Sequence, residues 1–255
     1  HSEPPVPAPN FYDYYGTYWN RVMGRTVCIT GANRGLGLGF TWDFLRRGWT
    51  VAATCRTPGE AVELHELQAE YGELLLIVKC DVTSGESVRE MARVVAGKIP
   101  ALDILVNNAG VLPDDDSIEI VQEDVLLSTF DINVAGPMRI TQALLPLVRL
   151  GREKKIIHIS TEMGSIGSNK RGGAYSYRIS KAALNMLMKN LSLELYSEGI
   201  VSMALHPGWA QTDMGGVNAT VPVGLSIRGM MELIGNATLQ ESGRVFDYTG
   251  RELMF

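Results

Sequence analysis

A tyrosine and a lysine four residues apart, Tyr177 and Lys181, have a spacing that could support catalysis. Residues four apart on a helix lie on one face, so these side chains would meet if the stretch is helical. A phenol has a pKa near about 10, and an adjacent ammonium favours the phenolate. We expect Lys181 to lower the pKa of Tyr177 by about three units, about 4 kcal/mol, and to make it a proton donor and acceptor near neutral pH. Tyr175 has no lysine at this spacing, which leaves Tyr177 as the candidate.

A second pattern is the glycine-rich segment 30–37, with the spacing GxxxGxG, between a strand-like run and a helix-like run. Glycines at such a junction allow a tight turn and a close approach of backbone amides to a pyrophosphate, and the helix N-terminus adds positive potential. The spacing differs from the common GxGxxG fingerprint, and a purely structural turn is the alternative. We expect a dinucleotide to bind here, against Gly31, Asn33, Arg34, Gly35, Leu36 and Gly37.

The residues after the second expected strand indicate which dinucleotide binds. An acid at that point usually binds the ribose 2′-hydroxyl of NAD, but residues 53–57 contain none. Arg56 stands there instead, nineteen residues after Gly37, and Arg34 lies in the glycine loop. Two arginines suit the additional phosphate of NADP(H). We therefore expect NADP(H) as the cofactor; the alternative is that both arginines are solvated surface cations.

Strand-like and helix-like patterns alternate along the chain and predict the elements that must position these residues. We expect strands over residues 25–30, 50–55, 74–80, 102–107, 154–160, 200–206 and 245–248. Helices are expected over 35–47, 59–71, 84–99, 123–150 (with a kink at Pro137) and 173–197, with Ser84 as a cap residue. This order predicts an α/β fold, a doubly wound parallel sheet of about seven strands with helices on both faces. Residues 23–255 form one domain, and the proline-rich residues 1–22 form an extended arm.

Composition limits the function further. The chain has 255 residues, 45% of them apolar and 20% charged, so it can form a sizeable core. Its formal net charge of −5 argues against nucleic acid or an anionic membrane as the main partner. We expect no membrane span and no signal peptide. The three cysteines, in apolar runs without a CxxC pair, predict buried free thiols in a reducing compartment, and no metal site is indicated.

Taken in order, the motifs resemble those of the short-chain dehydrogenase/reductase family from about residue 25 to residue 255. Residues 174–216 and the ending 247–253 are similar, more narrowly, to the sniffer and C-factor group of carbonyl reductases. The resemblance implies a single-domain Rossmann-type fold. It also implies a catalytic set formed by Asn133, Thr161, Tyr177 and Lys181. Besides the glycine loop and Arg56, it implies cofactor contacts from Asp81, Val82, Asn108, Ala109, Gly110, Tyr177, Lys181, Pro207, Gly208 and Thr212.

The chain departs from the family at one catalytic position. The family places a serine second in a pair after the fifth strand, where this chain has Ser160 and then Thr161. A threonine hydroxyl can make the same hydrogen bonds, although its methyl group narrows the pocket. We expect Thr161 to hold the substrate carbonyl, with Ser160 as the fallback, because strand alternation points Ser160 to the opposite face.

The function that the resemblance implies is reduction of a ketone or aldehyde to an alcohol by NADPH, with Tyr177 as proton donor. Lys181 would bind the nicotinamide ribose, and Asn133 would hold a water that links Lys181 to solvent. A dinucleotide-binding regulatory protein with little turnover is the alternative, and a lyase or epimerase on the same fold is a third hypothesis. We expect a cytoplasmic homodimer that acts on a small apolar carbonyl compound.

Four weaker patterns are interpreted as structural. His158 and His206 are expected to be hydrogen-bonded core histidines, and Asp114–Asp116 a solvated loop. Two stripes are expected to pack on the sheet: Phe130, Val134, Met138, Thr141, Leu145 and Val148 in one, and Leu184, Met188, Leu191 and Leu195 in the other. Segment 209–235 is either a mobile lid over the substrate or a packed helix and loop.

Overall fold

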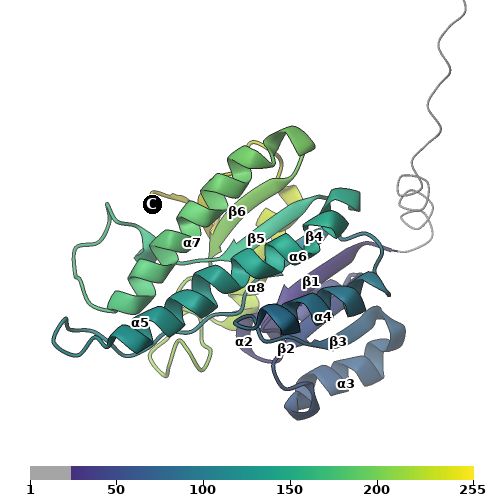
Figure 1. Ribbon diagram of the computed structural model, residues 1–255, viewed down its shortest axis with the longest axis horizontal. Helices are drawn as coiled ribbons and strands as arrows, with labels where there is room; N and C mark the ends of the chain where they lie inside the picture. The colour runs from purple at the N-terminus through teal and green to yellow at the C-terminus, as the bar shows by residue number, and fades with distance from the viewer. Residues whose placement is uncertain (1–23) are drawn as a thin grey trace, which may run out of the picture.

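A computed structural model describes residues 24–255, so the arm expected over residues 1–22 lies outside the described residues. The described chain forms one sheet in the order β3-β2-β1-β4-β5-β6-β7-β8, which is parallel up to β7 (Figure 1). The strands are β1 Thr26–Thr30, β2 Thr50–Cys55, β3 Leu75–Lys79, β4 Ile104–Asn107, β5 Lys155–Ile159, β6 Val201–His206, β7 Val245–Asp247 and β8 Glu252–Leu253. The expected α/β fold with its doubly wound sheet is confirmed, and all seven expected strands are present.

The sheet has one strand more than expected. β8 pairs antiparallel with β7, Phe246 opposite Glu252, and closes that edge of the sheet. Arg244 forms an ion pair with Glu252, which holds the short strand in register. A strand of two residues carries no alternation that a sequence pattern can reveal, and for this reason the sequence analysis missed it.

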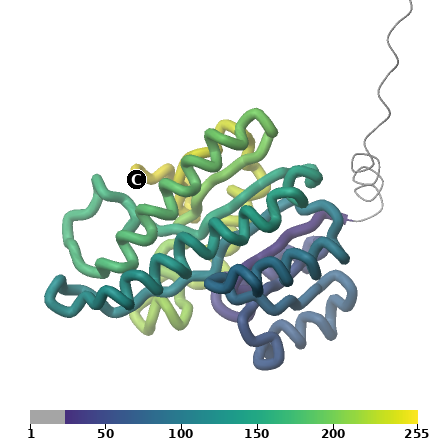
Figure 2. Tube along the Cα trace, viewed as in Figure 1, coloured from purple at the N-terminus to yellow at the C-terminus, as the bar shows by residue number. Residues whose placement is uncertain are grey.

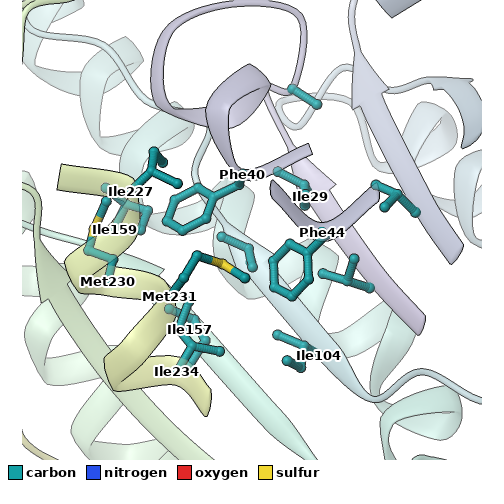
Figure 3. Packing of buried hydrophobic residues seen from close by; sticks show 14 of the residues in the cluster. Ile29, Phe40, Phe44, Ile104, Ile157, Ile159, Ile227, Met230, Met231 and Ile234 are labelled. Carbon is teal, nitrogen blue, oxygen red and sulfur yellow. The ribbon is translucent and has the colours of Figure 1, made fainter. Parts of the chain in front are cut away.

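Helices cover both faces of the sheet, as Figure 1 shows. They are α2 Gly35–Arg46, α3 Val62–Tyr71, α4 Gly85–Ala96, α5 Glu123–Phe130, α6 Gly136–Leu150, α7 Tyr175–Glu194 and α8 Val223–Asn236. Helices α2, α3 and α8 share a core with Ile157 and Ile159 of β5, and Figure 3 shows Phe40, Phe44 and Met231 at its centre. Helices α4 and α6 share the core on the opposite face with Ile156. Successive β5 residues therefore enter opposite cores, as a doubly covered strand requires.

The expected long helix 123–150 is interrupted. A π-helical turn over Asp131–Ala135 separates α5 from α6, directly before the expected kink at Pro137. Of the apolar stripe expected here, Val134, Thr141 and Val148 are buried and Leu145 packs against the core, as expected, whereas Phe130 and Met138 are exposed. In the second stripe, on α7 and the turn after it, Leu184, Met188 and Leu195 are buried and Leu191 packs against the core, as expected.

Other element boundaries differ from the expected ones by a few residues. The expected helix 59–71 starts as a 3₁₀ turn over Pro58–Glu60 before α3, and the helix expected from residue 173 begins at Tyr175. Ser84 caps α4 as predicted by accepting the amide hydrogen of Ser87. All three cysteines are free and buried, also as predicted. No helix within residues 24–255 is long and apolar enough to cross a membrane.

Strand order determines where a ligand can bind. β1 lies between β2 and β4 in the sheet. The chain therefore adds β2 and β3 on one side of β1 and then crosses to add β4 on the other side. In such sheets, ligands bind outside the carboxyl ends of the strands at this switch point. The long connections that follow β4, β5 and β6 extend beyond one end of the sheet (Figure 2). The candidate residues of the sequence analysis lie in or beside these connections and the glycine loop.

Candidate active site

The glycine loop between β1 and α2 has the backbone that its sequence predicts. Gly31 and Gly35 have φ of +63° and +53°, a region that side-chain-bearing residues rarely adopt. Gly37 is required for a different reason, since a Cβ there would collide with the carbonyl oxygen of Gly31. Gly31 and Gly35 are therefore required by their positive φ angles, and Gly37 is required by the close packing within the loop.

A second motif braces this loop. The side-chain amide of Asn108 donates to the carbonyl oxygens of Thr30 (2.8 Å) and Gly31 (3.0 Å). The Thr30 hydroxyl in turn accepts the backbone N–H groups of Asn108 (3.0 Å) and Ala109 (3.1 Å). The segment that the family resemblance identified as a cofactor contact therefore also locks the loop to the end of β4.

The N-terminus of α2 is suited to an anion. Its N-cap residue, Arg34, makes no side-chain capping bond, and the first turn carries no acid. Backbone N–H groups of a first helical turn have no partner inside the helix, and together with the helix dipole they favour a phosphate. Asn33 and Leu36 lie half-buried in the same turn. These residues fit the pyrophosphate of a dinucleotide.

The two arginines expected to bind a 2′-phosphate differ in their surroundings. Arg34 forms an exposed ion pair with Asp213, at 3.1 Å. Arg56, exposed after β2, has no hydrogen bond or ion pair with another residue of the described chain. Near it, Asp81 accepts hydrogen bonds from the backbone N–H and the hydroxyl of Thr83, and these bonds hold the pKa of Asp81 below its usual value. Its neighbour Val82 is buried against the helix that begins with Gly136.

Tyr177 and Lys181 lie in the first two turns of α7, and both are buried. The Lys181 ammonium lies 5.6 Å from the centre of the Tyr177 ring and donates to the carbonyl oxygen of Ile159 at 2.8 Å. Burial raises the pKa of Tyr177 to about 12 and lowers that of Lys181 to about 8. The expected lowering of the Tyr177 pKa is therefore wrong for this structure, because desolvation outweighs the nearby ammonium.

Asn133 lies in the π-helical turn and is buried. Its side-chain oxygen accepts the N–H of Val111, and its nitrogen donates to the carbonyl of Val111 and to the hydroxyl of Ser180 (2.9, 2.9 and 3.0 Å). A Cβ on Gly110 would lie 3.2 Å from the Asn133 oxygen and 3.7 Å from the Lys181 nitrogen. Gly110 therefore leaves room between the two groups that the sequence analysis expected to be linked by water.

Ser160 and Thr161 both line the active-site cavity, contrary to the expectation that Ser160 points to the opposite face, but their hydroxyls have different partners. The Ser160 hydroxyl donates to Asn185 at 2.7 Å inside the protein. The Thr161 hydroxyl accepts the N–H of Met163 at 3.2 Å and caps the short 3₁₀ turn Glu162–Gly164. Because the Ser160 hydroxyl is committed to a core partner, Thr161 is the better placed of the two to meet a substrate.

A cavity of about 590 Å³ is lined by two of the four expected catalytic residues. Thr161 and Tyr177 line it, and Pro207, Gly208 and Thr212 reach it from the connection after β6. Apolar lining comes from Leu36, Leu112, Met163, Trp209 and Met214. Segment 209–235 therefore has two parts. Residues 209–215 contribute to the cavity wall, and α8 packs into the core that it shares with α2 and α3.

The expected solvated loop at Asp114–Asp116 is confirmed for Asp114 and Asp116, which are exposed, but is wrong for Asp115. Asp115 is only 2% exposed, and its carboxylate accepts the N–H of Ser176 at 2.9 Å. Asp116 accepts the N–H of Ala174 at 2.9 Å. Both acids therefore stabilise the N-terminus of α7, where negative charge is favoured. This role could not be predicted from the sequence, because the two acids lie about sixty residues before the helix whose N-terminus they stabilise.

The two histidines differ from the expectation of hydrogen-bonded core residues. His158 is fully buried, but neither ring nitrogen has a hydrogen-bond partner in the described structure. Burial lowers its pKa to about 3, so the ring is neutral. His206 lines the cavity, and burial lowers its pKa as well. Within residues 24–255, no three metal-ligating side chains are placed to hold an ion.

Comparison with known proteins agrees with this geometry. A family model described as short chain dehydrogenase matches residues 25–220. The chain belongs to the short-chain dehydrogenase/reductase family. As a member of this family it is an oxidoreductase. It is 47% identical over 152 residues to the C-signal protein of Myxococcus xanthus, covering 60% of this chain and 92% of that protein.

Two solved structures are similar over most of the short-chain dehydrogenase/reductase chain. The NADPH-bound carbonyl reductase from chicken fatty liver is 35% identical, with a TM-score of 0.86 over 91% of this chain and 100% of that one. The carbonyl reductase Sniffer of Drosophila melanogaster is 33% identical, with the same TM-score and the same coverage. The expected resemblance to the sniffer and C-factor group is thus confirmed.

Proposed function

We propose that the protein is an NADPH-dependent carbonyl reductase that converts a ketone or aldehyde to an alcohol. The observation that carries the proposal is the convergence of Thr161 and Tyr177 at one cavity beside the glycine loop, with the Lys181 ammonium 5.6 Å from the Tyr177 ring. NADPH as the cofactor is supported by its presence in the similar chicken enzyme. Arg56, which forms no hydrogen bond or ion pair with a described residue, is available for the 2′-phosphate, and the uncapped start of α2 is available for the pyrophosphate.

When bound, NADPH supplies the hydride that the carbonyl carbon accepts. The hydroxyls of Thr161 and Tyr177 donate hydrogen bonds to the carbonyl oxygen, where negative charge develops during the reaction. Because burial raises its pKa to about 12, Tyr177 carries its proton at neutral pH and can transfer it to that oxygen. In this account the catalytic acid needs no prior ionisation.

Lys181 and Asn133 serve the return of the proton. The Lys181 ammonium uses one of its three N–H groups for Ile159, which leaves two for the nicotinamide ribose and for a water molecule. Asn133 is fixed by Val111 and Ser180, and its oxygen can accept one more hydrogen bond. We propose that a water held between them reprotonates Tyr177 from solvent through Lys181.

The decisive experiment measures NADPH oxidation against a panel of aldehydes, ketones and quinones with the parent protein and Tyr177→Phe. General-acid catalysis contributes about 10²–10⁴-fold, so Tyr177→Phe is expected to lose that factor in kcat while still binding NADPH. Tyr175→Phe is the matched control and should react like the parent. Tight NADPH binding without turnover on any compound would instead support a dinucleotide-binding regulator.

We also propose that the protein is a cytoplasmic homodimer. Helices α5 and α7 expose Leu127, Phe130, Ile179, Met186 and Leu193, an apolar set that a second copy can cover. Sedimentation of the parent and of Met186→Glu tests this, since a dimer should dissociate in the variant. A parent that sediments as a monomer at micromolar concentration would contradict the dimer. The cytoplasm is supported by three buried free thiols, which persist in a reducing compartment, and fractionation of the producing cells tests it.

A further inference from the structure

The outer part of the active-site cavity carries positive charge. The lining residues include Lys170, Arg171 and Arg178, but Glu162 is the single carboxylate among them. The chain as a whole has the opposite sign, with a net charge of −5. The local excess of cations is therefore a property of this cavity and does not follow from the composition.

None of the three cations forms an ion pair within the described part of the chain. No acidic side chain of residues 24–255 lies within ion-pair distance of Lys170, Arg171 or Arg178. The guanidinium of Arg178 donates to the carbonyl oxygens of Gly172 (3.1 Å) and Gly173 (3.0 Å), which are neutral acceptors. These bonds fix the connection between β5 and α7 and leave the charge of Arg178 uncompensated.

Two of these cations lie in the exposed part of the cavity lining, whereas Arg178 directly follows Tyr177 in α7. Thr161 and Tyr177 are buried, whereas Lys170 and Arg171 are exposed in the connection before α7. Apolar side chains, Leu112 and Met163 among them, line the same cavity. A molecule with its carbonyl at Thr161 and Tyr177 and an apolar body against this lining can extend toward Lys170 and Arg171.

We propose that the substrate is a carbonyl compound with an anionic group, such as a carboxylate, at the end opposite its carbonyl. This inference rests on the proposed reductase function and specifies its substrate class. Lys170 and Arg171 bind the anion at the mouth of the cavity, where a carboxylate keeps part of its hydration. The attraction raises the local concentration of such substrates and weakens as salt screens it.

The test compares 4-carboxybenzaldehyde with methyl 4-formylbenzoate, two aldehydes of similar shape that differ in charge. The parent is expected to show a higher kcat/KM for the acid. The double variant K170Q/R171Q should reduce the ratio of acid to ester about tenfold, the factor that corresponds to about 1.4 kcal/mol. Its kcat/KM for the ester and its Kd for NADPH should change less than about twofold, because neither involves the substrate anion.

A matched control separates local from general electrostatics. The double variant K98Q/R152Q removes two exposed cations that do not line the cavity, so it changes the net charge equally and should leave the acid-to-ester ratio unchanged. An equal loss in both double variants would overturn the proposal, as would a parent that prefers the ester. A weakened NADPH Kd in K170Q/R171Q would also overturn it, since these cations would then serve the cofactor.

The outcome also distinguishes this inference from the proposed function. Reduction of both aldehydes without preference for the acid contradicts the anionic substrate and leaves the reductase intact. Reduction of neither contradicts the reductase for aromatic aldehydes. In that case, calorimetric titration of the protein with the two compounds decides the inference by itself, because tighter binding of the acid requires no turnover.

Discussion

The two neighbouring hydroxyls after β5 are expected to respond in opposite ways to mutation. Thr161→Val removes the hydroxyl proposed to hold the carbonyl oxygen and keeps the shape of the side chain. The expected loss is about 10²–10³-fold in kcat, the range for one deleted oxyanion donor. The variant also loses the 3.2 Å bond to the N–H of Met163, a cap worth about 1 kcal/mol of unfolding free energy. Thr161→Ser retains the hydroxyl and should keep both activity and cap.

Ser160→Ala should show the reverse. Its hydroxyl donates to the oxygen of Asn185, whose nitrogen already lacks a partner in the described structure. Removing the hydroxyl leaves a buried amide with no hydrogen bond on either atom. The expected cost is about 1–3 kcal/mol of unfolding free energy, with kcat for the same aldehyde close to that of the parent.

The assay pairs NADPH oxidation on one good substrate with urea unfolding for all three variants. We expect activity and stability to separate, with Thr161→Val losing mainly activity and Ser160→Ala losing mainly stability. If Ser160→Ala is inactive while folded and Thr161→Val reacts like the parent, the wrong hydroxyl has been assigned. If both react like the parent, Tyr177 holds the carbonyl alone.

Three further predictions follow from other residues. Arg56→Ala should raise the Kd for NADPH about 10–100-fold and leave the Kd for NADH unchanged, because a charge-assisted bond is worth about 1.5–3 kcal/mol. Arg34→Ala should have a smaller effect on the Kd for NADPH, since Arg34 must first break its ion pair with Asp213. Equal Kd values for the two cofactors in the parent, measured by fluorescence titration, would contradict both roles. Asp115→Ala should lower the unfolding free energy by about 1–2 kcal/mol and reduce kcat, because the cap at the start of α7 is lost. Asp115→Asn should lower the unfolding free energy less, and Asp114→Ala, at an exposed position, should leave it unchanged. An unchanged unfolding free energy for Asp115→Ala in urea would refute the capping role of Asp115. The pKa of His158 in the folded chain is about 3, so between pH 6.5 and pH 3 the unfolded chain binds a proton that the folded chain does not bind. This difference lowers the unfolding free energy by about 2 kcal/mol between about pH 7 and pH 5. Unfolding of His158→Leu should lack that part of the pH dependence, and identical pH profiles for the variant and the parent would contradict the assignment.

The parts of the site that were predictable from sequence are those in which function depends on nearby residues in the chain. Gly31, Gly35 and Gly37 are required by the backbone of a single loop, and their spacing alone indicates that loop. Tyr177 and Lys181 share a helical face for the same local reason. The order of strands and helices follows from alternating periods, which also act over short distances.

The features that the sequence analysis missed depend on contacts that only the folded chain creates. Asp115 is buried because α7 begins beside it, and nothing in an acidic tripeptide announces a partner sixty-one residues away. His158 is buried without a hydrogen bond, although Asn107 lies opposite it on β4 with an unpartnered side-chain oxygen, and a strand pattern cannot reveal this. The pKa of Tyr177 depends on desolvation from all sides, and a lysine at the right spacing gives only one contribution.

The π-helical turn at Asp131–Ala135 makes the length of the chain, and not only its residue types, a determinant of this active site. A π-turn accommodates one residue more than a regular helical turn, and each residue rotates a helix by about 100°. Deleting a single residue from this turn would let α5 and α6 merge into one regular helix, and Asn133 would turn away from Val111 and Ser180. Chimeras and sequence alignments in this region should therefore keep the number of residues between Phe130 and Gly136. A one-residue gap there would move the Asn133 side chain away from its partners even if every residue type were retained.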